Sequence, residues 1–406
     1  FIIDSAVIMS RRTDKIVLPS ASVGVETHLL IHRYGASNSD QKAYIQASLH
    51  ADELPGLLVA HHLINLLETA DKKGLIAKEI VVVPFANPIG LSQNFMGVHQ
   101  GRFNFATGVN FNRSFVNVSS DLVKSLEGKL HPSDEKENMR IIRAAFRDQL
   151  DSLCSVDQDP KPVEDVMKMH LLREACDADL VLDLHCDNDA VMHLYTHDRL
   201  WPQLSDLAAL LGSECNLIDG DSGGCCFDEA CSTPWAVLAD KFPGFPIPMA
   251  CQSTTVELRG EYDVYDSFAK KDAVALYQFL LGRGYILPEP TAATAATADL
   301  PIVPTQLPAL RRDATPLTGV DMIKASCAGI LAWKVKAGEY VEEGQLLGEI
   351  VSVQDPFAAR TPLRTRTSGV VFGLLTHKLA IPGLIVIKVA GETALPWRTG
   401  NLLTSR

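Results

Sequence analysis

The stretch Tyr44-Ile-Gln-Ala-Ser-Leu-His50-Ala-Asp-Glu53-Leu-Pro-Gly56 decides the fold and introduces the first candidate site residues. A strand-like run over residues 43–49 ends at His50, and an apolar, helix-like segment follows over residues 57–69. The spacing of His50 and Glu53 can place an imidazole and a carboxylate on the same side of one turn. That is two-thirds of the protein ligand set of a catalytic zinc site. Taken alone, the pair can equally cap and polarise a turn.

Further strand-like runs lie at residues 16–34, 78–85, 178–188 and 251–260, and helix-like segments separate several of them. Strand, helix and strand in this order indicate an α/β fold with a mixed sheet flanked by helices. The polar and charged segment 115–165 reads as an insertion that covers the sheet. The expected helices are 135–153, 166–176, 204–211 and 266–281.

The run over residues 178–188 also ends in polar residues and contains a histidine, His185. Ligands collect outside the carboxyl ends of strands in open α/β sheets, which is where His50 and His185 are expected. Asp183 lies two residues earlier on the same face, so it can orient His185 through a hydrogen bond. By itself His185 is more typical of a satisfied histidine at a strand end, but with His50 and Glu53 it completes a set of two histidines and one carboxylate.

Glu257 lies inside a strand-like run where an apolar residue is expected. A carboxylate in such a place is costly unless it is paired, exposed or functional. The alternative is that Glu257 simply faces water.

Composition limits the classes of partner. The 406-residue chain is 47% hydrophobic and 21% charged, with a formal net charge of −12. This charge argues against nucleic acid or an anionic membrane as the main partner, although local arginines can still bind a small anion. The sequence contains no apolar run of the ~18 residues that span a bilayer. The first residues show no secretory pattern, and the odd number of nine cysteines fits reduced thiols, so the cytoplasm is the expected compartment.

The composition changes after residue 285. Residues 286–310 are rich in Ala, Thr and Pro, which is typical of a linker. Residues 311–406 show short strands punctuated by glycines, which predict a small all-β domain. We therefore expect a domain over 1–285, a linker over 286–310 and a β-rich domain over 311–406.

Taken together, the motifs resemble the zinc carboxypeptidase fold, and more closely its succinylglutamate desuccinylase/aspartoacylase branch. The resemblance covers residues 25–285 apart from the 115–165 segment. The C-terminal segment is similar to a barrel-sandwich domain of the biotinyl/lipoyl type, but residues 353–360 contain no lysine to modify. The motifs that carry the likeness are His50-x-x-Glu53, Gly101-Arg102-Phe103, Asn110-Phe-Asn112-Arg113, His185 and Thr254-Thr-Val-Glu257-Leu-Arg259.

The resemblance implies one zinc ion per chain, held by His50, Glu53 and His185, which suits hydrolysis of an amide. It also implies that Glu257 is the general base and that Arg102 stabilises the oxyanion. Asn112 and Arg113 would bind a substrate carboxylate, for which a guanidinium offers a bidentate fit. A salt bridge within the loop is the simpler alternative for Arg113.

Three functions remain open at this point. The first is a zinc-dependent amidohydrolase that deacylates an N-acyl amino acid or a similar small carboxylated amide. The second is a metallocarboxypeptidase acting on peptides or cell-wall fragments, and the third is a metal-binding module without catalysis. We read residues 220–233 as a loop that lines or covers the site. The β domain either restricts access to the site or forms a contact in a homo-oligomer.

Overall fold

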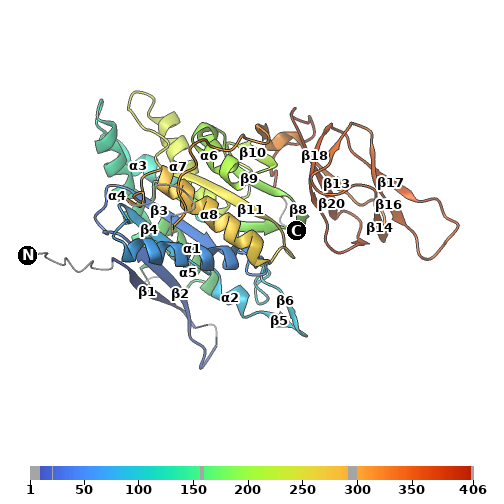
Figure 1. Cartoon of the computed structure of the whole chain (residues 1–406), viewed down its shortest axis with the longest axis horizontal. Helices are drawn as coiled ribbons and strands as arrows, with labels where there is room; N and C mark the ends of the chain where they lie inside the picture. The colour runs from blue at the N-terminus through green and yellow to red at the C-terminus, as the bar shows by residue number, and fades with distance from the viewer. Residues whose placement is uncertain (1–9, 21, 156–159, 291–299, 404–406) are drawn as a thin grey trace, which may run out of the picture.

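The computed structural model describes residues 10–20, 22–155, 160–290 and 300–403. A large sheet lies between helices on both of its faces, and a smaller β domain lies beside it (Figure 1). The predicted α/β class and the additional all-β part are both confirmed. Across the described helices, we find none with the length and apolar composition needed to span a bilayer.

The large sheet has nine strands, and its four central neighbours, β4, β3, β7 and β11, run parallel. The edge strands add antiparallel pairs, so the sheet is mixed as predicted. In spatial order the strands are β1 (Arg12–Leu18), β2 (Thr27–Tyr34), β4 (Glu79–Val83), β3 (Lys42–Ala47), β7 (Leu180–Asp187), β11 (Gln252–Gly260), β9 (Met192–His197), β10 (Cys215–Asp219) and β12 (Ala314–Pro316).

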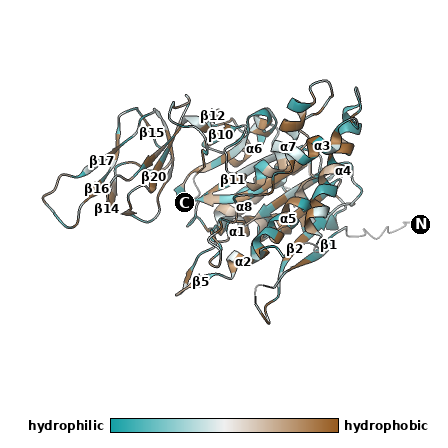
Figure 2. Ribbon diagram, turned by 180° about the vertical axis from the view of Figure 1, so that it is seen from behind, coloured by the Kyte–Doolittle hydropathy of each residue, from teal (hydrophilic) through white to brown (hydrophobic). Residues whose placement is uncertain are grey.

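Two hydrophobic cores form because side chains of the central strands alternate between the two faces. Ala43, Ile45 and Ala47 of β3 pack on one core with three helices, whereas Tyr44 packs on the opposite core. Figure 2 shows hydrophobic residues concentrated on the central strands. The first core is covered by α1 (Pro55–Lys72), α6 (Trp201–Leu211) and α8 (Asp266–Gly282), and the second by α3 (Ser119–Leu126), α4 (Glu135–Cys154), α5 (Val163–Ala175) and α7 (Phe227–Lys241).

Helix α7 corrects one prediction, because residues 227–233 of the expected loop 220–233 are its first turns. The buried apolar side chains Phe227, Ala230 and Trp235 recur at helical spacing, whereas Pro234 in the same segment disfavours a helix. The glycines and cysteines before Phe227 made the whole segment resemble a turn. Burial of the apolar face against the sheet outweighs this local preference.

Helices α3 and α4 lie in the segment read as an insertion, and they cover one face of the sheet. The short helices α2 (Pro88–Leu91) and η1 (Asp198–Leu200) and the hairpin β5 (Asn94–Phe95) and β6 (Val98–His99) complete this part of the chain. That the segment 115–165 is an insertion stays a prediction.

The C-terminal part is a sandwich of two antiparallel sheets around its own core. One sheet orders β13 (Val320–Lys324), β20 (Ile385–Gly391), β18 (Gly369–Leu374) and β15 (Tyr340–Val341). The other orders β17 (Thr361–Arg364), β16 (Leu346–Val351), β14 (Gly329–Trp333) and β19 (Leu379–Ala380), and η2 (Leu317–Gly319) precedes β13.

Each of the two parts of the chain adds one short strand to a sheet of the other part. The two-residue strand β8 (Asp189–Ala190) pairs with β18 of the sandwich, and β12 of the C-terminal part pairs with β10 of the large sheet. Residues 291–299 of the expected linker lie outside the described residues, and Leu300 is buried in the core of the large domain. The domain limits at 285 and 311 remain predictions. These two strand pairs hold the β domain beside the carboxyl end of β7.

Candidate functional site

Three adjacent parallel strands carry the predicted site. His50 follows the end of β3, His185 lies in β7, and Glu257 lies in β11 directly beside His185 in the register. His185 is three residues from the start of the loop after β7, slightly inside the strand end where the sequence pattern placed it. Because parallel strands end at the same edge of a sheet, all three side chains reach one region of the molecule.

Backbone strain is concentrated around these residues. Ser48, Ser114 and Arg259 have left-handed backbones (φ of +63°, +56° and +67°), and each lies within two residues of a predicted site residue. Such conformations cost on the order of 1–3 kcal/mol each and persist only where surrounding structure enforces them. The strand β11 also shifts register between Glu257 and Gly260. The fold therefore holds neighbours of the site residues in backbone conformations that isolated chain segments would avoid.

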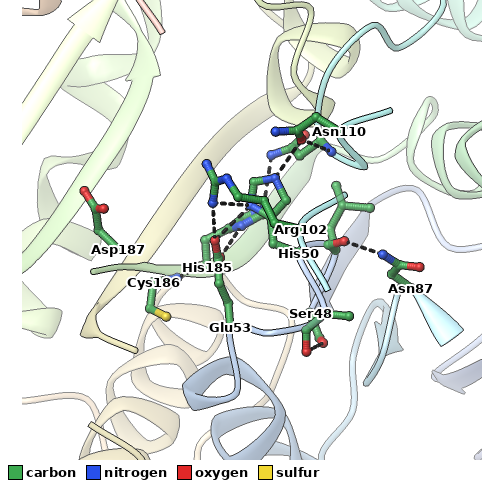
Figure 3. Close-up of polar contacts among 12 residues, drawn as sticks. Ser48, His50, Glu53, Asn87, Arg102, Asn110, His185, Cys186 and Asp187 are labelled. Atoms are coloured by element: carbon green, nitrogen blue, oxygen red, sulfur yellow. Dashed lines mark hydrogen bonds and ion pairs between the residues drawn. The ribbon is translucent and has the colours of Figure 1, made fainter. Parts of the chain in front are cut away.

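His50, Glu53 and His185 converge on one point (Figure 3). The Nδ1 atom of His50 lies 2.8 Å from one carboxylate oxygen of Glu53, and the Nδ1 atom of His185 lies 2.7 Å from the other. Their ligand atoms all lie within 4.8 Å of one another, and the three residues are buried. The structure thus brings together all three residues that the resemblance assigns to a metal.

The opposite ring nitrogens of both histidines are occupied by oxygen acceptors. The Nε2 atom of His50 lies 2.9 Å from Asn110 Oδ1, and that of His185 lies 2.9 Å from Asp183 Oδ2. These partners assign the proton of each ring to Nε2, which leaves the Nδ1 lone pairs directed at the centre of the triad. Two imidazole nitrogens and one carboxylate, oriented in this way, fit a zinc ion.

Burial lowers the pKa of His50 to about 4, and the nearby guanidinium of Arg102 acts in the same direction. A histidine that is neutral at physiological pH can bind a metal without first losing a proton. Asp183, which we predict to orient His185, also accepts a 3.0 Å hydrogen bond from Gln46 Nε2 through its second oxygen. Gln46 itself was not predicted.

Glu257 lines the same cavity, and its Oε2 atom is buried without a hydrogen-bond partner among the described residues. Burial raises the pKa of Glu257 to about 8, and the negative charge of Glu53 adds to this effect. The side chain therefore faces the cavity and not bulk water. A carboxylate with a pKa near neutrality is suited to accept and return a proton.

Arg102 lies against the triad. Its Nη1 atom donates to Glu53 Oε1 over 3.0 Å and lies 3.2 Å from His50 Nδ1. This approach needs Gly101, because a Cβ atom there would lie 2.4 Å from the backbone nitrogen of Asp52. The Gly101 carbonyl also accepts a 3.0 Å hydrogen bond from the Ala51 amide, so the loop is fixed against the His50 turn.

Asn112 and Arg113 also lie at the cavity, but Asn112 has partners within the protein. Its amide oxygen accepts from the Phe227 amide at the start of α7 over 2.9 Å, and its amide nitrogen lies 3.2 Å from His185 Nε2. Arg113 donates through Nη1 to the Asn112 carbonyl over 2.7 Å and approaches Cys226 Sγ at 3.3 Å. Asn112 thus connects the start of α7 to the loop that carries Arg113, and Arg113 is one of the cations that line the cavity.

The cavity has a volume of about 350 Å³ and contains groups that the sequence patterns did not single out. Asp228, in the first turn of α7, is buried there, and burial raises its pKa to about 7 with a further contribution from Glu229. Ser222 Oγ is buried without a hydrogen-bond partner in the described chain. Asp187 could have been found from strand alternation, because it lies two residues after His185. Lys388 carries no such signal, since it reaches the cavity from the β domain.

Comparisons with known proteins agree with this geometry. The sequence model of the Succinylglutamate desuccinylase/Aspartoacylase catalytic domain matches residues 39–213, which include His50, Glu53, Arg102 and His185. A comparison with curated protein sequences finds no match.

Solved structures share the fold over nearly the whole chain. A Shewanella frigidimarina NCIMB 400 protein, assigned to the succinylglutamate desuccinylases/aspartoacylases, superimposes with a TM-score of 0.79 at 22% identity, covering 95% of this chain and 98% of its own. A Shewanella amazonensis SB2B protein assigned to the same family has a TM-score of 0.75 at 23% identity, with 93% and 98% covered.

The product-bound ectoine utilization protein EutE (DoeB) from Ruegeria pomeroyi has a TM-score of 0.61 at 15% identity, with 94% and 95% covered. At these identities the likeness shows the fold alone. The family model adds a match at the level of sequence, which is limited to residues 39–213. Residues 39–213 therefore match the catalytic domain of the succinylglutamate desuccinylase/aspartoacylase family, the family that the motifs predicted.

Proposed function

We propose that the protein is a zinc-dependent amidohydrolase that deacylates an N-acyl amino acid or a similar small carboxylated amide. One observation carries the proposal: the His50, Glu53 and His185 triad shares a cavity with Glu257, a carboxylate that has a buried oxygen without a partner. A structural ion-pair cluster would not need this additional carboxylate, whose burial is unfavourable.

His50, Glu53 and His185 would hold one zinc ion per chain. When bound, zinc polarises a carbonyl group and lowers the pKa of water, which is the chemistry that amide hydrolysis requires. Glu257 accepts the proton of the attacking water and passes it to the nitrogen of the leaving amine. The carbon–nitrogen bond then breaks, and the products are a carboxylic acid and a free amino group.

Arg102 and Arg113 have separate tasks in this proposal. The guanidinium of Arg102, beside the triad, donates hydrogen bonds to the oxygen that becomes negative during attack. Arg113 binds the carboxylate of the substrate, and the Asn112 carbonyl keeps its guanidinium in position. Arg102 contacts Glu53 in the structure, and a zinc ion held by the triad would neutralise this carboxylate and make the guanidinium available to the substrate.

The size of the cavity and the part of its lining that comes from the β domain support a small substrate over a long peptide. All nine cysteines are free thiols, which supports a reducing compartment, and we place the reaction in the cytoplasm. These observations favour the deacylase over the metallocarboxypeptidase.

Product analysis tests the proposal. Purified full-length protein, loaded with zinc, is incubated with a panel of N-acyl amino acids and, separately, with short peptides. We expect release of the free acid and the amino acid from the first panel, measured by mass spectrometry. Release of C-terminal amino acids from peptides alone would establish the carboxypeptidase. Stoichiometric zinc without turnover of either panel would establish a non-catalytic metal-binding module.

A further inference from the structure

One wall of the cavity is apolar and is built by both parts of the chain. Its members belong to a single hydrophobic cluster between the large domain and the β domain, or pack directly against it. Because most of them follow residue 310, the wall exists only when the C-terminal part folds back on the site. The wall consists of Tyr195, Leu217, Leu317, Met322, Ile385 and Leu403.

The wall is fixed relative to the groups proposed for catalysis. Tyr195 lies on β9, the strand that pairs with β11 and thus lies beside Glu257. On the other side, Ile385 begins β20, and the ion pair between Lys388 of β20 and Asp187 of β7 ties that strand to the site. The pairing of β8 with β18 adds a direct backbone connection. The wall is therefore a rigid part of the cavity.

The side chains of this wall offer no positive charge to an anion. Arginine and lysine residues among the described cavity-lining residues are Arg102, Arg113 and Lys388. Arg102 contacts Glu53, and Lys388 pairs with Asp187. Arg113 donates to the Asn112 carbonyl and approaches Cys226 Sγ. A carboxylate buried against these side chains would lose its hydration without gaining an ion pair from the wall, which is unfavourable.

We propose that this wall binds the acyl group of the substrate and that the group is an uncharged aliphatic chain longer than acetyl. The inference rests on the proposed amidohydrolase function and narrows it, because Arg113 is assigned to the carboxylate of the amino acid. The acyl group lies on the other side of the scissile amide and reaches the wall. The cavity of about 350 Å³ accommodates a small amino acid with a chain of medium length.

A series of substrates that differ only in the acyl group tests the inference. The zinc-loaded full-length protein is assayed with acetyl, butanoyl, hexanoyl and succinyl derivatives of the same amino acid, using one apolar, one acidic and one basic amino acid. Burying one methylene is expected to raise kcat/KM about fourfold. The hexanoyl compound should therefore exceed the acetyl compound by about two orders of magnitude. A preference for the succinyl or acetyl compound would overturn the inference and leave the amidohydrolase proposal intact.

A matched pair of variants locates the effect at the wall. Ile385→Lys introduces a cation into the wall and is expected to lower kcat/KM for the hexanoyl compound about tenfold or more, while raising the ratio of succinyl to hexanoyl turnover. Ile381→Lys changes the same residue type at an exposed position of the β domain that does not line the cavity, and should leave the preference unchanged. Equal effects of both variants would contradict the assignment.

Binding of the free acids gives a result even if no amide is hydrolysed. Hexanoate and succinate are titrated into the zinc-loaded protein by calorimetry, and the Ile385→Lys variant is titrated in parallel. We expect hexanoate to bind more tightly than succinate, with the order reversed in the variant. Absence of turnover with this binding order would reject the proposed reaction but keep the apolar site. Tighter binding of succinate to the unaltered protein, or equal binding, would reject the site.

Discussion

Asp187 and Lys388 form an ion pair that joins strand β7, two residues after His185, to strand β20 of the β domain. The ammonium group of Lys388 also lies 5.9 Å from the centroid of the Phe372 ring. Although burial opposes it, Lys388 lowers the pKa of Asp187 below its usual value, so the carboxylate stays charged. The β domain is thus attached directly to the strand that carries a proposed metal ligand.

Removing one partner of this ion pair should destabilise the protein. Lys388→Met leaves the Asp187 carboxylate largely buried without its cation, and we expect the free energy of unfolding in urea to fall by about 3 kcal/mol. Lys334→Met is the matched control, because Lys334 pairs with Glu349 near the surface and should contribute less than about 1 kcal/mol. Adding Asp187→Asn to Lys388→Met should recover part of the loss. A cost equal to that of Lys334→Met would show that the pair does not hold the domains together.

His50→Ala should abolish most metal binding. The substitution removes one of two imidazole ligands and leaves two protein donors, too few for a stable catalytic zinc site. Metal content per chain is measured by elemental analysis after dialysis. His61→Ala, at an exposed position of α1, is the control and should retain the metal. Unchanged metal content in His50→Ala would mean that the triad is not the metal site.

Glu257→Gln should remove activity but not the metal. The amide cannot accept the proton of the attacking water, so we expect kcat to fall by about two to four orders of magnitude. Glu261→Gln changes a second carboxylate that lines the cavity and is expected to keep kcat within about fivefold. Both variants should bind zinc as the unaltered protein does. Comparable losses in the two variants would argue against a specific role for Glu257.

Acid should destabilise the fold through His193, whose pKa is lowered to about 4 by burial. Its Nδ1 atom donates to the Val191 carbonyl over 2.8 Å, and its Nε2 atom has no hydrogen-bond partner among the described residues. Between about pH 6.5 and pH 4 the unfolded chain binds a proton that the folded chain does not. Stability therefore falls as the pH decreases through this range, by up to about 3 kcal/mol from this residue.

The variant His193→Asn isolates this contribution, because its amide can still donate to Val191 but does not titrate. Urea unfolding is measured for both proteins from pH 7 to pH 4. The difference between their free energies of unfolding should change in favour of the variant as the pH falls. A constant difference across this range would show that His193 does not cause the acid sensitivity.

Gly101→Ala should displace Arg102 from the triad. The added Cβ atom would lie 2.4 Å from the Asp52 nitrogen and 2.6 Å from the backbone of Ala51, so the loop must shift. We expect kcat/KM to fall at least about tenfold, because positioning errors of this size are costly in active sites. Gly244→Ala is the control, since nothing lies within 4 Å of the added atom. Similar kinetics for both variants would remove Gly101 from the positioning of Arg102.

Local sequence determined the strands that carry the site and the types of most of the side chains in it. His50 and Glu53 share one turn, and the long apolar runs at residues 78–85, 178–188 and 251–260 formed strands as predicted, because periodicity and spacing act over a few residues. The prediction of a loop over residues 220–233 was wrong for residues 227–233, again because it relied on local sequence. The glycines before Phe227 and the following Pro234 disfavour a helix, although the apolar spacing that begins α7 favours one. The helix forms because the sheet buries Phe227 and Trp235.

Only the tertiary structure decided which distant residues meet. The order of β3, β7 and β11 in the sheet brings His50, His185 and Glu257 together, and no local pattern specifies the neighbours of a strand. The same holds for Asn110 behind His50 and for Lys388, which reaches the cavity from a strand some two hundred positions after Asp187. The residues of the site thus lie in short sequence motifs, whereas the partly apolar lining of its cavity results from long-range packing between the two parts of the chain.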